Sequence, residues 1–353
     1  MSAPVVIAAG GTGGHMVPAH VFAGELRRRG RTVALFSDAR GLRLPGLFEG
    51  VERHELASGS PARGSAAATA VAVARGALKA RGLLRRLKAA AVVGFGGYPS
   101  LPGLVAALWA GLPTMIHEQN AVLGRVNRLL ARRVDRVATA YAAVARLEAD
   151  PARVRLTGNP VRPEIAAVPP PGPMAGNSIL VMGGSQGAAV FATVVPRALS
   201  RLAADGRPIR VMQQARPEDI AAVREAYDRA GIPAEIAPFF TDVPALLARA
   251  GLVIARAGAS TIAELTASGR PAVLVPLPTA MDDHQSANAR ALAEAGGAVL
   301  VPQAQFTPER LADELARLTP ERLAAMAGAA RALGRPDAAA ALADVLEEIA
   351  PHE

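Results

Sequence analysis

The chain has 353 residues, which is long enough for two domains that each bury a core of their own. It contains no cysteine, and this excludes disulfides, cysteine-ligated zinc and a cysteine nucleophile. The N-terminus has no basic leader, and the longest apolar stretch, residues 65–74, is far shorter than the roughly 20 residues that span a bilayer. We therefore expect a soluble, cytoplasmic protein.

The net charge of +9 is unevenly divided along the chain. Residues 1–163 carry 23 Lys and Arg against 9 Asp and Glu, a net charge of +14, whereas residues 164–353 carry 16 against 21, a net charge of −5. No acidic residue lies between Glu55 and Glu118, and both lysines of the chain, Lys79 and Lys88, fall in that stretch. This asymmetry predicts an anionic partner for the first half only.

The first predicted strand, residues 5–9, stops at the glycine turn Gly10-Gly11-Thr12-Gly13-Gly14-His15, and a helix is predicted over residues 17–29. A strand, a glycine turn and a helix together aim free backbone N–H groups at an anion. The glycines allow close approach of the main chain to a ligand, and His15 would lie within reach of that ligand. The alternative is an ordinary turn in which the histidine caps the helix or packs.

A second strand is predicted over residues 32–36, and it ends at Asp38, where the acid of a dinucleotide site would lie. An irregular stretch to about residue 64 precedes a helix predicted over residues 66–90, with a break near Gly82. From Arg75 to Lys88 this helix combines leucines with six basic residues, a pattern typical of segments that rest on anionic lipid. A solvated helix that packs its leucines on the sheet is an equally good interpretation.

Strands are then predicted over residues 91–95, 114–116, 134–139 and 154–156, and helices over 99–110, 123–131 and 142–148. Strands that alternate with helices indicate a parallel sheet with both faces covered. Residues 158–162 and the prolines at 169–173 indicate a linker, so the first domain is expected to comprise residues 1–162.

The second half repeats the opening of the first. A strand predicted over residues 178–182 runs into Gly183-Gly184-Ser185-Gln186-Gly187-Ala188 and a further helix. Later strands are predicted over residues 209–212, 234–236, 252–255, 272–275 and 298–301. We expect a second α/β domain over residues 163–336 that faces the first across a cleft, and a last helix, about 337–353, that packs back on the first domain.

Ligands of open parallel sheets bind beyond the carboxyl ends of the strands, and the polar clusters of this chain fall there. The segment from Arg256 to Glu264 passes from a strand to a helix at a glycine, so its N–H groups and hydroxyls suit a diphosphate, with Glu264 able to accept hydrogen bonds from a ribose. A capped helix with a surface glutamate is the alternative. Neither glycine turn is followed by the Lys-Ser/Thr of a P-loop, and no Asp-x-Asp pair suggests a metal site.

Taken together, these motifs resemble the MurG family of bacterial N-acetylglucosaminyltransferases, and the resemblance covers nearly the whole chain. The segments that carry it, in family order, are Gly10–His15, Gly96-Gly97-Tyr98-Pro99-Ser100, His117-Glu118-Gln119-Asn120, Gly158-Asn159-Pro160-Val161-Arg162, Gly183–Ala188, Arg256–Thr261, Glu264 and Asp282-Asp283-His284-Gln285.

The resemblance implies the GT-B fold, an α/β architecture of two Rossmann-like domains with parallel sheets. It implies inverting, metal-independent transfer of GlcNAc from UDP-GlcNAc to the 4-hydroxyl of lipid I, the undecaprenyl-pyrophosphoryl-linked MurNAc-pentapeptide, which gives lipid II for peptidoglycan. It implies no cofactor, no nucleic-acid partner, and a peripheral protein on the cytoplasmic side of the inner membrane. Another GT-B glycosyltransferase, a UDP-sugar epimerase, or a non-enzymatic nucleotide-sugar-binding module are the alternatives.

By matching motif positions, the resemblance implies a set of donor contacts: Thr12, Gly13, Gly14, Asn120, Arg162, Ser185, Phe240, Ala259, Ser260, Thr261, Ile262, Ala263, Glu264 and Gln285. Inversion needs a base at the acceptor hydroxyl, and a neutral imidazole can serve at cytoplasmic pH. We expect His15 to be that base, with Glu118 as the reserve candidate or the partner that orients His15. The residues expected at the membrane or the acceptor are Lys79, Leu83, Leu84, Arg85, Arg86, Lys88 and Tyr98, with Leu87 also dipping into the lipid.

Overall fold

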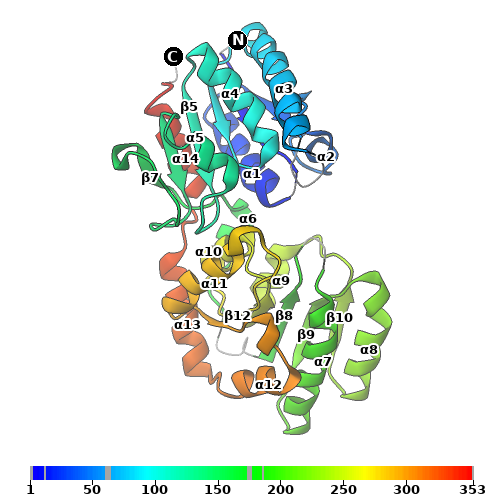
Figure 1. Ribbon diagram of the computed structural model, residues 1–353. Helices are drawn as coiled ribbons and strands as arrows, with labels where there is room; N and C mark the ends of the chain where they lie inside the picture. The colour runs from blue at the N-terminus through cyan, green and yellow to red at the C-terminus, as the bar shows by residue number, and fades with distance from the viewer. Residues whose placement is uncertain (1–2, 12, 60–64, 173–176, 185–186, 352–353) are drawn as a thin grey trace. The chain divides into compact units, whose positions relative to one another are not determined.

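The computed structural model describes residues 3–11, 13–59, 65–172, 177–184 and 187–351 (Figure 1). It divides the chain into two compact units. Unit 1 comprises residues 1–162 and 335–353, and unit 2 comprises residues 163–334. Each unit is a parallel sheet with helices on both faces, which confirms the predicted α/β fold class.

Unit 1 has a seven-stranded sheet in the order β3-β2-β1-β4-β5-β6-β7, and all of its strand pairs are parallel. Between β1 and β4 the order of the strands reverses direction, so the sheet has a switch point there. The strands are β1 Val5–Ala8, β2 Val33–Ser37, β3 Glu52–Glu55, β4 Ala91–Gly94, β5 Thr114–Glu118, β6 Arg136–Thr139 and β7 Val154–Leu156. The α-helices are α1 Gly13–Arg28, α2 Ala39–Leu42, α3 Ala66–Leu87, α4 Leu101–Ala110, α5 Arg125–Leu130 and α14 Ala338–Glu347.

Alternate residues of the central strand β1 enter two different cores, as a strand with both faces covered requires. Val5 and Ile7 pack with α1 and α14, and Val6 and Ala8 pack with α3, α4 and α5. The C-terminal helix α14 is thus part of unit 1. Its Leu342 and Leu346 are fully buried, and Arg29 of unit 1 binds the helix through Asp344 at 2.7 Å and Glu347 at 3.0 Å.

Unit 2 has a six-stranded parallel sheet in the order β10-β9-β8-β11-β12-β13, with its switch point between β8 and β11. The strands are β8 Ser178–Met182, β9 Arg210–Gln214, β10 Ala234–Ala237, β11 Leu252–Ala255, β12 Ala272–Leu274 and β13 Ala298–Leu300. The α-helices are α6 Pro163–Ala166, α7 Ala189–Ala204, α8 Ile220–Arg229, α9 Val243–Arg249, α10 Ala259–Ser268, α11 His284–Glu294, α12 Pro308–Ala316 and α13 Pro320–Leu333.

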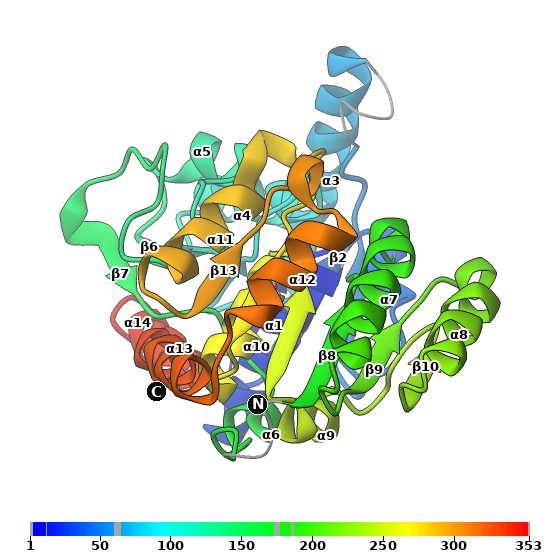
Figure 2. The same cartoon turned by 90° about the horizontal axis from the view of Figure 1, so that it is seen from below.

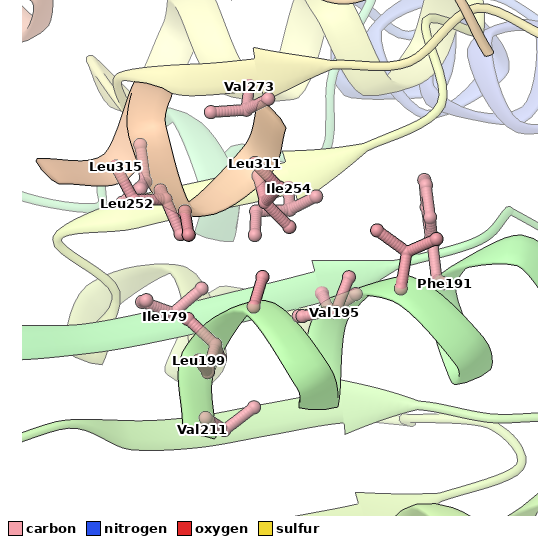
Figure 3. Close-up of a cluster of buried hydrophobic side chains, with 14 of the residues drawn as sticks. Ile179, Phe191, Val195, Leu199, Val211, Leu252, Ile254, Val273, Leu311 and Leu315 are labelled. Carbon is pink, nitrogen blue, oxygen red and sulfur yellow. The ribbon is translucent and has the colours of Figure 1, made fainter. Parts of the chain in front are cut away.

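On one face of this sheet, α7 lies between α12 and α8 (Figure 2). The labelled side chains of the core beneath it come from β8, β9, β11 and β12 and from the helices α7 and α12 (Figure 3). Phe191, Val195 and Leu199 of α7 meet Leu311 and Leu315 of α12 over the strand residues Ile179, Val211, Leu252, Ile254 and Val273. With few aromatic residues in the chain, branched aliphatic side chains fill most of this core.

The structure differs from the sequence-based expectation in three segments of unit 1. The stretch after β2 contains α2 and the edge strand β3, which we did not predict. Residues 142–148 form turns instead of a helix, because Ala145 pairs with the segment 121–123 and Arg146 has a φ of +64°. Helix α3 is unbroken at Gly82, since its buried side chains on both sides of that position belong to one core.

Candidate functional site

The first polar site of unit 1 lies at the carboxyl ends of β1, β4 and β5, beside the switch point. Helix α1 begins at Gly13, so His15 is in its first turn and is half-buried. Thr12 lies outside the described residues. Asp38 holds the loop from the other side, because its Oδ1 accepts from the backbone N–H of Gly11 at 2.9 Å and of Gly41 at 3.0 Å. Asp38 therefore anchors the loop between β1 and α1.

His15 packs against the glycine turn that follows β4. A Cβ placed on Gly97 would lie 3.2 Å from Cε1 and 3.3 Å from Nδ1 of His15, and one placed on Gly96 would lie 3.6 Å from Nε2. Both glycines have positive φ, +81° at Gly96 and +70° at Gly97. The turn after β4 therefore needs glycine both for its backbone and for room beside the imidazole. Two motifs that are far apart in the sequence, Gly10–His15 and Gly96–Ser100, meet at this point.

His117 lies in the core of unit 1, beneath the polar site. It is fully buried; its Nε2 donates to the carbonyl of Gly158 at 2.8 Å, and its Nδ1 accepts from Nε2 of Gln119 at 3.0 Å. Burial lowers the pKa of His117 to about 4, although the bond to Gly158 opposes the shift. The ring is therefore neutral near pH 7, and its hydrogen bond to Gly158 joins β5 to the segment 158–162.

Glu118 shapes the loop that follows β5. The residue is 1% exposed, and both carboxylate oxygens accept hydrogen bonds. Oε1 accepts from the backbone N–H of Asn120 at 3.0 Å and from its Nδ2 at 3.1 Å. Oε2 accepts from the backbone N–H of Gly124 at 2.8 Å and from Nδ2 of Asn127 at 2.9 Å. Both oxygens of the carboxylate are therefore occupied by donors within the protein. The contacts make Glu118 a loop-forming group, and they do not support its expected role as reserve base.

The structure corrects the predicted membrane contacts of α3. Leu83 and Leu84 are 9% and 2% exposed and belong to the core with α4 and β4, and Leu87 packs against that core. These leucines cannot enter a lipid surface, because they already cover the sheet. The basic residues Arg85, Arg86 and Lys88 are exposed, while Nζ of Lys79 donates to the carbonyl of Glu55 at 2.9 Å.

Other large apolar side chains of α3 and α4 are exposed. Val71 and Leu78 on α3 are 52% and 63% exposed, and Trp109 on the adjacent helix α4 is 59% exposed. On α3 the positions of Val71, Arg75, Leu78 and Arg85 follow one helical stripe, and all four are exposed. We call Val71, Arg75, Leu78, Arg85 and Trp109 the α3–α4 surface. Tyr98 is half-buried and packs against the core beneath.

The polar site of unit 2 lies at the carboxyl ends of β8, β11 and β12. At the end of β8, the N–H of Gly183 donates to Oε1 of Gln214 at 3.1 Å, and Nε2 of Gln214 donates to the carbonyl of Gly184 at 3.1 Å. A Cβ on Gly183 would lie 2.4 Å from the backbone N of Ala188, so the turn closes too tightly for any side chain. Ser185 and Gln186 lie outside the described residues.

Helix α10 begins shortly after β11, and its N-terminus is a candidate anion site of unit 2. Its N-cap is Gly258, which supplies no side-chain cap, so the first N–H groups of the ten-residue helix have no capping side chain. The hydroxyl of Ser260 is buried and has no hydrogen-bond partner. Glu264 is half-buried one turn further along. The expected donor contacts that lie on this turn are Ala259, Ser260, Thr261, Ile262, Ala263 and Glu264.

Gln285 and Arg256 hold the loops around this helix start. Oε1 of Gln285 accepts from the N–H of Ala257 at 3.2 Å and of Leu277 at 3.0 Å, which joins the loops after β11 and β12 and leaves its Nε2 as the group for a ligand. Arg256 donates to the carbonyls of Val275 and Pro276 and stacks 5.2 Å from the ring centre of Phe191.

The remaining expected donor residues lie on separate elements of the two units. Gly13 and Gly14 are in the first turn of α1, and Asn120 is on the loop held by Glu118. Arg162 is half-buried and is the last residue of the first segment of unit 1, whereas Phe240 is half-buried after β10. Sequence reasoning missed Asp38 as a loop anchor, as well as Gln214 and Asn127, because each acts through a partner distant in the sequence.

Two Rossmann-like parallel sheets, each with a polar site at its switch point, define the class of GT-B glycosyltransferases. The chain belongs to glycosyltransferase family 28: the model of the N-terminal domain of that family matches residues 5–139, and that of the C-terminal domain matches residues 178–344.

Among curated proteins, the chain is 50% identical to a UDP-N-acetylglucosamine–N-acetylmuramyl-(pentapeptide) pyrophosphoryl-undecaprenol N-acetylglucosamine transferase of Rhodospirillum centenum, over 98% of this chain and 94% of the relative. A protein of the same name from Paramagnetospirillum magneticum is also 50% identical, over 99% and 97%. Among solved structures, MurG of Acinetobacter baumannii aligns with a TM-score of 0.81 at 31% identity, over 98% of this chain and all of that one. A putative UDP-N-acetylglucosamine 2-epimerase of Listeria monocytogenes aligns at 0.72 with 16% identity over 100% and 98%, a likeness of fold alone.

Proposed function

We propose that the chain transfers GlcNAc from UDP-GlcNAc to the 4-hydroxyl of MurNAc in lipid I, with inversion at the anomeric carbon, and so forms lipid II for peptidoglycan. The observation that carries this proposal is the 50% identity, over nearly the full length of both chains, to transferases of that printed name. The 16% identity to the epimerase gives the alternative no comparable support.

The donor half of the proposal rests on unit 2. The start of α10 presents backbone N–H groups without a capping side chain, together with the buried hydroxyl of Ser260. Such groups bind the diphosphate both in UDP-GlcNAc and in the UDP that is formed by the transfer. Because they are fixed by the fold, they stabilise the growing negative charge on the departing UDP without rearranging. Glu264 and Nε2 of Gln285 are the groups we assign to hydroxyls of the donor. Asn120, Arg162 and Phe240 are proposed as further donor contacts.

The acceptor half rests on unit 1, where His15 is the proposed general base. A single displacement is sufficient for inversion: the acceptor oxygen bonds to the anomeric carbon, the bond from that carbon to the diphosphate breaks, and the hydroxyl proton passes to the imidazole. Such a base contributes roughly 10²- to 10⁴-fold to the rate. Two other residues at the end of β5 were candidates for the general base. Glu118 accepts hydrogen bonds from its own loop and from Asn127, and His117 is buried and neutral.

The direct test measures UDP release from UDP-GlcNAc with and without a lipid I analogue, together with the identity of the sugar product. A transferase of this kind releases UDP and forms a disaccharide only when the analogue is present. An epimerase converts the sugar nucleotide without the analogue. Another GT-B glycosyltransferase with a different acceptor and a binding module do neither, so only the proposed transferase gives a disaccharide that depends on the analogue.

We also propose that the α3–α4 surface docks unit 1 on the anionic cytoplasmic leaflet, where lipid I is expected. It combines exposed apolar side chains with arginines on a stretch that has no acidic residue, and none of the helices among the described residues is long and apolar enough to cross a membrane. Each basic residue near such a surface contributes roughly 1 kcal/mol. The docking surface therefore uses Val71, Leu78 and Trp109 in place of the leucines predicted from the sequence.

The test is cosedimentation with vesicles that contain anionic phosphatidylglycerol. Reversal of two charges, Arg75→Glu with Arg85→Glu, is expected to weaken binding by roughly 30-fold or more, because about 2 kcal/mol is lost. Arg229→Glu, a change of the same kind on an exposed helix of unit 2, is the matched control and should leave binding unchanged. Unchanged binding of the double variant would refute the assignment of this surface.

A further inference from the structure

The segment that follows β7 is anchored in unit 1 at Gly158. The N–H of this residue donates to the carbonyl of Thr139 at 3.1 Å, and its carbonyl accepts from Nε2 of His117 at 2.8 Å. Gly158 has a φ of +86°, and a Cβ at this position would lie 2.7 Å from Cβ of Arg335. The backbone of residue 158 is therefore fixed both by hydrogen bonds and by packing.

The chain is anchored again at the start of unit 2. Helix α6 begins at Pro163 and packs with α9 and α10, and Nη2 of Arg270 donates to the carbonyl of Pro169 at 2.6 Å. Unit 1 ends at Arg162, so only residues 159–162 lie between the two anchors, and we call them the connecting segment. Pro160 has a fixed φ, which leaves few backbone angles of this segment free to change.

The side chain of Asn159, the first residue of the connecting segment, makes no hydrogen bond. The residue is 6% exposed, and both its Nδ2 and its Oδ1 are buried without a partner. An asparagine amide has two N–H donors and an acceptor oxygen, and burying them unpaired costs free energy. Such groups are rare in folded proteins, and each one calls for an explanation. The amide of Asn159 therefore destabilises the arrangement of the connecting segment in which it is found.

We propose that Asn159 is a conformational latch for the connecting segment, and this rests on the proposed function. The segment has a second arrangement in which the amide of Asn159 is hydrogen-bonded, and UDP-GlcNAc selects that arrangement. Arg162, at the other end of the segment, is one of the proposed donor contacts, so the donor acts on the segment directly. The hydrogen bonds that the amide gains favour the second arrangement, and a ligand that binds this arrangement better shifts the population toward it.

The first test follows the side-chain amide of Asn159 by ¹H–¹⁵N NMR in the full-length protein labelled with ¹⁵N-asparagine. Its signal is identified by its absence from Asn159→Asp. We expect an amide proton to move downfield, as it does when a hydrogen bond forms, on saturation with UDP-GlcNAc, whose binding is measured by calorimetry. Bound donor with an unchanged amide signal would overturn the latch. Absence of donor binding would refute the donor assignment, and the latch with it.

The second test uses Asn159→Leu, which keeps the number and branching of the side-chain heavy atoms and removes the polar groups. The melting temperature should rise by a few degrees, because no unpaired amide is buried. The Kd for UDP-GlcNAc should rise by roughly 10-fold or more, because the second arrangement loses its hydrogen bonds. An unchanged Kd would overturn the proposal, whatever the melting temperature.

Asn127→Leu is the matched control for stability. Asn127 is also a buried asparagine of unit 1, but its Nδ2 donates to Oε2 of Glu118 at 2.9 Å and to the carbonyl of His117 at 3.2 Å. The same substitution there removes made hydrogen bonds and should lower the melting temperature. A decrease of the same size in Asn159→Leu would show that its amide is paired in the folded protein, which contradicts the latch. If Asn159→Leu does not fold, the NMR titration of the wild type decides.

Discussion

Acidification should destabilise unit 1 through one buried histidine. His117 has a pKa of about 4 in the folded protein, against 6.5 for a free imidazole. Between these values the unfolded chain binds a proton that the native protein does not, so the free energy of unfolding falls as the pH drops from 6.5 toward 4. One pKa unit corresponds to 1.36 kcal/mol, so the lowered pKa of His117 contributes about 3 kcal/mol to the free energy of unfolding. This contribution is fully present above pH 6.5 and is lost by about pH 4.

The assay exploits the single tryptophan of the chain, Trp109, which lies in unit 1. Its fluorescence during urea unfolding reports on unit 1 without a contribution from a tryptophan of unit 2, and it gives a free energy at each pH. His117→Gln keeps an N–H for the carbonyl of Gly158 but cannot titrate, so its loss of stability between pH 7 and pH 4 should be smaller than that of the wild type by about 3 kcal/mol. Equal losses in the two proteins would refute the reasoning.

Three further predictions concern unit 2. Gly183→Ala should abolish UDP-GlcNAc binding in calorimetry, because the added Cβ would lie 2.4 Å from the backbone N of Ala188; retained affinity would show that the turn can open. Ser260→Ala should raise the Kd for UDP-GlcNAc roughly 3- to 10-fold without lowering thermal stability, since its buried hydroxyl has no partner within the protein; an unchanged Kd would contradict the role. Arg270→Leu should lower the free energy of unfolding, measured in urea, by about 3–5 kcal/mol. The reason is that the guanidinium of Arg270 is fully buried and donates to the carbonyls of Leu247, Ser268 and Pro169. A decrease of less than about 1 kcal/mol would contradict this role of Arg270.

Apart from β3, the strands of both sheets could be predicted from sequence because they are short runs rich in apolar residues. The limits of β7, β8 and β11 coincide with the predicted ranges 154–156, 178–182 and 252–255. The prediction of a helix over residues 142–148 was wrong because the backbone of this segment pairs with residues 121–123. The local sequence pattern carries no sign of that contact. Strand β3 escaped prediction because it lies at the edge of the sheet and its sequence is charged.

The motifs of the site could be predicted, but their contacts could not. The sequence gives His15 and the glycines at 96 and 97 as separate motifs, and only the order of the strands brings β1 beside β4. The spacing of leucines along α3 likewise does not tell which of them face the sheet and which face solvent. The predicted lipid contacts therefore included Leu83 and Leu84, which are buried, and not Leu78, which is exposed. The role of Glu118 depends on Asn127, nine positions away on another element.

The central claim is that His15 removes the proton from a lipid-linked acceptor while unit 2 retains UDP. One measurement tests it most directly: transfer of labelled GlcNAc from UDP-GlcNAc to a lipid I analogue by the wild type and by His15→Gln, with the Kd for UDP-GlcNAc determined for both. We predict transfer that requires the analogue, a rate for the variant that is lower by roughly 10²- to 10⁴-fold, and equal affinity for the donor. A variant that turns over at the wild-type rate, or UDP release that does not depend on the analogue, would contradict the account.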